Sequence, residues 1–147
     1  MHIPDGFLDA KTIIATGAFS TAGLGTALRQ VGKHLQSRRI PLIGLTAAFI
    51  FVAQMVNFPV ASGTSGHLLG ATLAAVLLGP SAAVIVMSSV LIVQSLIFAD
   101  GGVLALGANM FNMALVAPLC GYGIYVYWNS KSGTGRWAAK PRTGCPR

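Results

Sequence analysis

The sequence predicts an all-α fold, a polytopic transmembrane bundle of about five helices, and the composition carries much of that prediction. Apolar residues make up 54% of the 147 residues and charged residues 9%, against about 25% charged residues in ordinary globular proteins. The mean hydropathy is +0.70. The apolar residues also gather in long runs, as membrane-spanning helices require.

Five apolar runs are expected to form the spans. Four of them cover about residues 12–31, 41–57, 81–99 and 108–128. The third run starts at His67 and is interrupted by Gly79-Pro80. It holds only about 12 residues, roughly 18 Å of helix against a hydrocarbon core of about 30 Å. Such a run cannot cross alone unless His67 lies well below the membrane surface, so we expect a sunken or re-entrant loop ahead of it.

The basic residues predict how the bundle is oriented. Nine of them form two clusters, between the first two runs and after the fifth: Arg29, Lys33, Arg38, Arg39, Lys131, Arg136, Lys140, Arg142 and Arg147. By the positive-inside rule, both clusters are cytoplasmic. Five crossings then place the N-terminus, the 58–67 loop and the 99–107 loop outside, with all three acidic residues. We expect residues 1–128 to form the membrane domain and residues 129–147 a basic, disordered cytoplasmic tail.

The residue patterns exclude several classes of function. The net charge is +7, but the basic residues form no stripe interleaved with aromatic residues, so we expect no nucleic-acid partner. Neither a Ser-His-acid set nor a carboxylate pair is present, so we expect no enzyme and no cofactor. The phosphate-binding pattern GxxxxGK[ST] is also absent, so ATP hydrolysis would have to come from a partner.

The first residues, MHIPDG, predict a metal site. The Met1 amine, the backbone nitrogen of His2 and the His2 Nδ1 can close fused chelate rings around one ion. His67 is the other histidine expected outside and offers a fourth nitrogen, and planar nitrogen coordination suits Ni(II), Cu(II) or Co(II). Because acidic residues and a proline stand where a signal peptide would carry positive charge, we expect this arm, residues 1–10, to be retained. The alternative is a disordered start and a histidine that caps a helix.

Polar residues near the two outer loops have two possible roles. The stretches NFPVASGTSGHLLG and QSLIFADGGVLALGANMFN combine glycines with short polar side chains. These side chains either satisfy the loop backbone or orient the metal ligands from behind. The candidates are Asn57, Thr64, Ser65, Gln94, Asp100 and Asn109.

Three motifs together resemble the CbiM/NikM family, the substrate-binding membrane components of energy-coupling-factor transporters for cobalt and nickel. They are MHIPDGFLDA, FPVASGTSGHLLGATLAAVLLGP and QSLIFADGGVLALGANMFNMA, and the resemblance runs over about residues 1–125. It implies that Met1, His2 and His67 bind Co(II) or Ni(II) as transported substrate, with Gln94 and Asn109 holding the loops. It also implies a bacterial or archaeal plasma membrane and several partners: a coupling transmembrane protein, two ATPase subunits and often a small accessory membrane protein.

The resemblance weakens toward the C-terminus. Family members usually continue to about seven spans, whereas here the fifth run is followed by NSKSGTGRWAAKPRTGCPR, and we expect a C-terminally truncated chain. The alternative function is a non-transporting remnant or an assembly partner of the transporter. A vitamin-binding component of the same transporter type is a third possibility, against which the paired histidines argue. The nitrogen donors do not distinguish cobalt from nickel.

Overall fold

The structure, a computed structural model, describes residues 2–34, 37–56, 58–59 and 65–132. The described helices are α1 (Ala10–His34), α2 (Ile40–Met55), α3 (Ala71–Leu78), α4 (Pro80–Ile97), α5 (Leu106–Met110) and α6 (Ala117–Lys131). A 3-10 turn, η1 (Ser37–Arg39), precedes α2, and a π-helical segment, η3 (Phe111–Val116), joins α5 to α6. Strands β1 (Phe58–Pro59) and β2 (Ser65–Gly66) pair antiparallel. The predicted all-α transmembrane bundle is confirmed, with this short hairpin as its one addition among the described residues.

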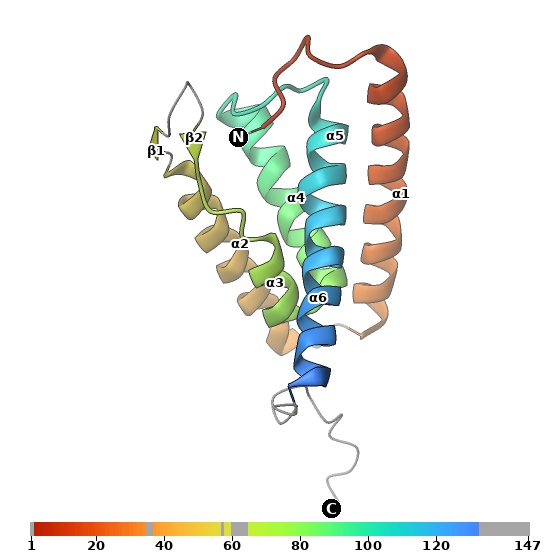
Figure 1. The fold of residues 1–147 in the computed structure, drawn as a ribbon, viewed down its shortest axis with the longest axis vertical. Coiled ribbons are helices and arrows are strands. Elements are labelled where there is room, and N and C mark those ends of the chain that lie inside the picture. The colour runs from red at the N-terminus through yellow and green to blue at the C-terminus, as the bar shows by residue number, and fades with distance from the viewer. Residues whose placement is uncertain (1, 35–36, 57, 60–64, 133–147) are drawn as a thin grey trace, which may run out of the picture.

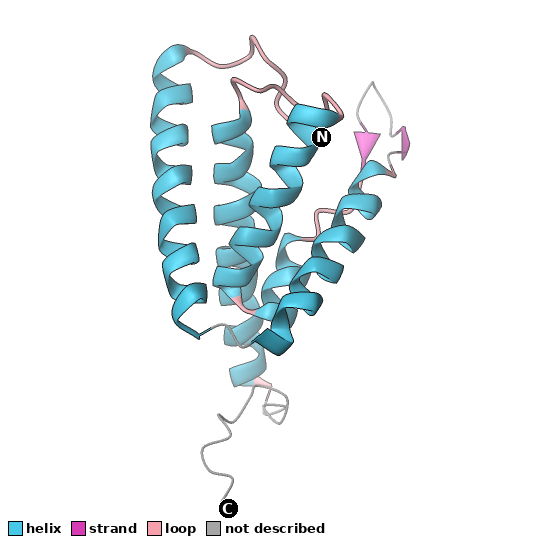
Figure 2. Cartoon of the chain, turned by 180° about the vertical axis from the view of Figure 1, so that it is seen from behind, coloured by secondary structure: helices cyan, strands magenta, loops and turns pink. Residues whose placement is uncertain are grey.

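The bundle has two distinct ends (Figure 1). At one end lie the N-terminal arm, the β1–β2 hairpin and the α4–α5 loop, and we call this the histidine end. At the other end α1 finishes, α2 begins and α3 turns into α4, and we call this the basic end. Seen from behind, the same helices run between the two ends with loops confined to them, apart from the segment that enters α3 (Figure 2).

Three described helical segments are long and apolar enough to cross a membrane. They are Ser37–Met55, Pro80–Ile97 and Leu106–Lys131, with mean hydropathies of 1.3, 2.0 and 1.3. The other two expected spans correspond to α1 and α3. Helix α1 has 25 residues, but glycine, threonine and serine make it less apolar, and α3 has only eight residues, about 12 Å of helix. Five crossings and their orientation therefore stay a prediction.

The helix of the third apolar run starts later than the sequence predicts. Helix α3 begins at Ala71, and His67 lies in the irregular segment between β2 and α3. Gly70 ends that segment with φ +70°, and a Cβ there would lie 2.8 Å from the Ile50 Cγ2 atom of α2. A left-handed residue packed this tightly stops the helix from extending back to His67. The segment runs beside α2 into the bundle (Figure 1), and its depth in the membrane stays a prediction.

Helix α4 lies at the centre of the core. It packs against α1, α2, α3 and the α5–α6 rod. Its buried side chains meet those of α2, α3 and η3, and the cluster includes Ile50, Ala71, Ala74, Ala75, Ala83, Val86, Met87, Leu91, Met113 and Ala114.

Small residues allow α1 and α5 to lie close together. A Cβ on Gly107 would lie 2.7 Å from the Gly17 Cα atom, and the Ser20 hydroxyl donates to the Gly107 carbonyl over 2.7 Å.

Candidate metal centre

Asn109 fixes the N-terminal arm to the histidine end. The Ile3 N–H donates to Asn109 Oδ1 over 2.8 Å, and Asn109 Nδ2 donates to the Ile3 carbonyl over 3.1 Å. The Gly102 N–H donates to the same carbonyl over 3.0 Å. Asn109 is only 5% exposed. One buried amide thus satisfies both backbone groups of Ile3, which sets the position of the residue that precedes it, His2.

Asp5 makes a second attachment that the sequence did not predict. Its carboxylate accepts hydrogen bonds from the backbone N–H groups of Val103, Leu104 and Ala105, over 3.2, 2.9 and 3.2 Å. These groups lead into α5, whose N-cap has no side-chain hydrogen bond of its own. A carboxylate at a helix start satisfies otherwise unpaired donors and complements the helix dipole. The cap comes from about a hundred residues away, so no local sequence signal marks it.

The His2 side chain is buried next to a carboxylate and a second imidazole. It is 2% exposed, and its Nδ1 lies 3.1 Å from Asp100 Oδ1, an electrostatic contact without the alignment of a hydrogen bond. Neither His2 ring nitrogen has a hydrogen-bond partner within the described part of the chain. Burial lowers the pKa of His2 below its ordinary 6.5, an effect that Asp100 partly offsets. A lowered pKa favours the neutral form of the ring, the form that binds metals.

His67 faces His2 across the same space. The two rings stack with centroids 5.8 Å apart and planes inclined by 22°. His67 Nδ1 lies 3.0 Å from the Leu68 carbonyl oxygen, which can only accept, so this contact assigns a proton to Nδ1. Metal–nitrogen bonds are about 2 Å long, and in the predicted planar chelate the fourth nitrogen lies beside His2 Nδ1. Two imidazoles at neighbouring corners have centroids roughly 4–5 Å apart, so the rings would have to move about 1 Å closer to bind one ion.

Two buried glutamines hold the loop that carries His67. Gln54 Nε2 donates to the Leu69 carbonyl over 2.8 Å, and Gln94 Nε2 donates to Gln54 Oε1 over 3.1 Å. The Gln94 backbone carbonyl also accepts from the Asp100 N–H over 3.1 Å. Gln94 therefore links the His67 loop to the Asp100 loop. The sequence predicts a role for Gln94 but not for Gln54, because a single glutamine near the end of an apolar run gives no sign of what it faces.

Two glycines let the arm lie close to the α4–α5 loop. Gly101 has φ +100°, and a Cβ there would lie 2.7 Å from the His2 Cβ. A Cβ on Gly102 would collide with the Asp5 carboxylate and lie 2.5 Å from the Asp5 backbone nitrogen. The DGG sequence therefore leaves room for the arm as well as forming a turn.

The structure brings together only part of the predicted site. His2, His67, Asp100, Gln94 and Asn109 gather at one end, as described above. Three predicted residues lie outside the described residues: Met1, Asn57 and Thr64. For Ser65, only its pairing with Pro59 in the hairpin is described. Within residues 2–34, 37–56, 58–59 and 65–132, no group of three or more His, Cys, Asp or Glu side chains could hold a metal ion.

The spanning segments and the helical core define the chain as a helical membrane protein. Comparison with known proteins narrows this class. The sequence model of CbiM, described as the cobalt uptake substrate-specific transmembrane region, matches residues 2–143. The chain belongs to the CbiM family.

Named relatives and a solved structure agree with this assignment. The fused nickel transport protein NikMN of Rhodobacter capsulatus is 43% identical over 85% of this chain and 36% of its own length. The cobalt transport protein CbiM of Lachnoclostridium phytofermentans is 39% identical over 85% of this chain and 51% of its own. A crystal structure of a truncated transition metal transporter superposes with a TM-score of 0.84 at 45% identity, covering 90% of this chain and 62% of that one. The chain thus spans about a third to three-fifths of the length of these proteins.

Proposed function

We propose that this chain is the substrate-capturing membrane component of a transporter that imports Co(II) or Ni(II). The observation that carries the proposal is the buried His2 ring stacked on His67, whose centroid lies 5.8 Å away. Family membership and the names of the relatives support a transport role rather than an enzymatic one.

The metal would be held by nitrogen donors. The Met1 amine, the His2 backbone nitrogen and His2 Nδ1 form the chelate, and His67 Nε2 supplies the fourth nitrogen. Binding through Nδ1 requires His2 to give up its present approach to Asp100, 3.1 Å away. The Asp100 carboxylate then lies beside a divalent cation, whose charge it partly balances. Both Ni(II) and Co(II) suit such a donor set.

Transport would depend on partners. The chain has no GxxxxGK[ST] loop, so its energy would come from two ATPase subunits through a coupling transmembrane protein, with a small accessory membrane protein as a further partner. The histidine end would face outward, because the basic residues around η1 and Lys131 at the end of α6 lie at the other end.

Isothermal titration of the purified full chain with Ni(II) and Co(II) tests the metal site. We expect His67→Ala, or one extra residue ahead of Met1, to weaken binding by at least about a hundredfold, because each removes a ligand. His34→Ala is the matched control, since His34 ends α1 at the basic end, and it should bind like the unchanged chain. Equal affinity of the His67→Ala variant and the unchanged chain would overturn the proposal.

A separate assay addresses the alternative, a non-transporting assembly partner. The chain is co-expressed with the coupling protein and ATPases of a CbiM-type transporter, and radiometal uptake is measured. Complex formation without uptake would favour a non-transporting assembly partner, and the absence of both would favour a remnant. Uptake that is lost in the His67→Ala variant supports the transport role.

A further inference from the structure

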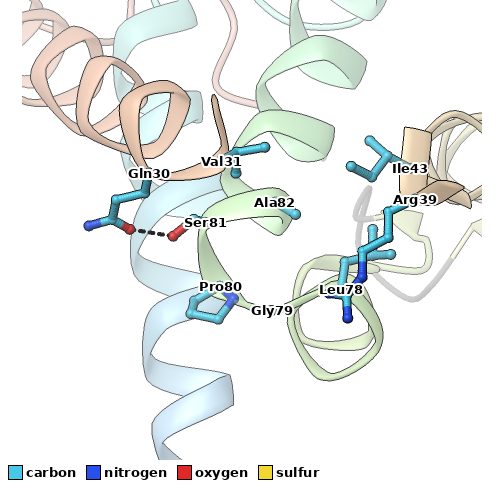
Figure 3. A pocket seen from close by; sticks show the side chains of 9 residues that line it. All are labelled: Gln30, Val31, Arg39, Ile43, Leu78, Gly79, Pro80, Ser81 and Ala82. Carbon is cyan, nitrogen blue, oxygen red and sulfur yellow. Dashed lines mark hydrogen bonds between the residues drawn. The ribbon is translucent and has the colours of Figure 1, made fainter. Parts of the chain in front are cut away.

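A cavity at the basic end is separate from the metal centre. It has a volume of about 400 Å³ and lies where the end of α1, the start of α2 and the α3–α4 corner meet (Figure 3). Helices α1 and α2 both pack on α4 but scarcely contact each other, which leaves space between them. The apolar part of its wall comes mainly from Val31, Ile43 and Leu78.

The cavity is bordered by positive charge that the chain itself does not neutralise. Arg39 lines it, and three more cations lie on the adjoining turns of α1 and η1: Arg29, Lys33 and Arg38. All three acidic residues of the chain lie at the histidine end: Asp5, Asp9 and Asp100. No side-chain carboxylate of this chain is therefore available to Arg39, and an anion from outside the chain would be attracted here.

Two helix starts add to this preference for an anion. Helix α2 begins directly after Arg39, and α4 begins at Pro80 on the cavity wall; neither has a side-chain cap. The first N–H groups of both helices lack partners within their helix and can donate to an anion, although the C-terminal ends of α1 and α3 also lie here and offset the helix dipoles. The Ser81 hydroxyl donates to Gln30 Oε1 over 2.5 Å, so it is used in joining α4 to α1 rather than in capping (Figure 3).

We propose that this cavity is a binding site for an anionic phospholipid. The phosphate would lie between the Arg39 guanidinium and the two helix starts, since arginine binds phosphate through two parallel hydrogen bonds. The glycerol and first acyl carbons would lie against Val31, Ile43 and Leu78. A volume near 400 Å³ is within the range of about 300–1,000 Å³ that small-molecule sites occupy. Basic pockets between spanning helices recognise such headgroups. This inference does not depend on the proposed metal function.

The test measures lipid retained by the full chain with native mass spectrometry and the matching shift of the thermal unfolding midpoint. The probes are phosphatidylglycerol, phosphatidylcholine and inorganic phosphate. Arg39→Gln removes the charge that lines the cavity, and Arg29→Gln removes a neighbouring charge outside it. Ile43→Trp fills the cavity and leaves every charge in place.

We expect phosphatidylglycerol to bind the unchanged chain and the Arg29→Gln variant alike. Binding to the Arg39→Gln variant should be about tenfold weaker, the loss of one charged contact. Ile43→Trp should lose retained lipid without any change in charge. Equal weakening by Arg29→Gln and Arg39→Gln would mean diffuse surface attraction and would overturn the proposal. Equal retention of phosphatidylcholine would also overturn it. So would an Arg39-dependent shift of the unfolding midpoint with inorganic phosphate alone.

Discussion

The two ends of the bundle differ in the interactions that hold their segments together. At the histidine end, segments far apart in the sequence are joined by hydrogen bonds that the Asp5 carboxylate accepts, the Gln54 amide donates and the Asn109 amide both donates and accepts. At the basic end, one side-chain pair, Ser81 with Gln30, joins α4 to α1, and charge accumulates without acidic partners among the described residues. The side chains of the histidine end are thus held in place without a ligand, which suits the proposed metal site. The basic end suits a ligand that charge attracts and apolar surface accepts.

The largest effect is expected from breaking the Asn109 attachment. Asn109→Leu leaves the N–H and carbonyl of Ile3 without the amide, in a place that stays partly buried. We expect a loss of about 2–4 kcal/mol in the free energy of unfolding, since two hydrogen bonds disappear. Metal affinity should fall about 10–100-fold, because the ligands lose their support. Denaturant unfolding and titration calorimetry measure the two quantities.

Asn112→Leu is the control for this change. Asn112 lies one turn further along the same helical rod but is exposed. The variant should keep both its stability and its metal affinity. An Asn109→Leu variant with unchanged metal affinity would show that the arm is positioned by something other than this amide.

A smaller effect is expected when the arm is pushed away from the α4–α5 loop. Gly102→Ala places a Cβ against the Asp5 carboxylate and 2.5 Å from its backbone nitrogen. Overpacking of this kind costs about 1–3 kcal/mol, and we expect metal affinity to fall about tenfold as the arm shifts. Gly25→Ala is the matched control, because nothing lies within 4 Å of its added Cβ. Equal metal binding by both alanine variants would mean that the close approach of the arm has no part in the site.

A smaller effect still is expected from the cap on α5. Asp5→Asn keeps the shape of the side chain but removes the charge from an acceptor of three N–H groups. We expect a loss of about 1 kcal/mol in the free energy of unfolding, which is typical for a weakened cap. The same change at Asp9, which begins α1, serves as the comparison and should leave metal binding unchanged. If both variants bind metal like the unchanged chain, the cap stabilises α5 without positioning His2.

The contrast between the ends also explains what could be predicted from sequence. Apolar runs and charge clusters report on the local chain, so the helices, the basic end and the sunken segment before α3 were predictable. Gln94, Asp100 and Asn109 were named because polar residues are rare in apolar surroundings. Asp5 and Gln54 were missed because their partners lie 98–100 and 15 residues away, and no residue's own surroundings in the sequence reveal such partners. The start of α3 was predicted four residues early, because the apolar character of Leu68 and Leu69 hides the left-handed Gly70.

The smallest expected effect tests whether the histidine end and the basic end act independently of each other. Helix α1 alone separates them by 25 residues, or roughly 37 Å, several times the screening length of about 10 Å at 0.1 M salt. Arg39→Gln should therefore change metal affinity by less than about twofold, although it removes a full charge. Asn109→Leu should in turn leave retained phosphatidylglycerol unchanged. Titration calorimetry measures the metal affinity of both variants, and native mass spectrometry measures the phosphatidylglycerol that they retain. A variant that changed both the affinity and the retained lipid would show that the helices couple the two ends.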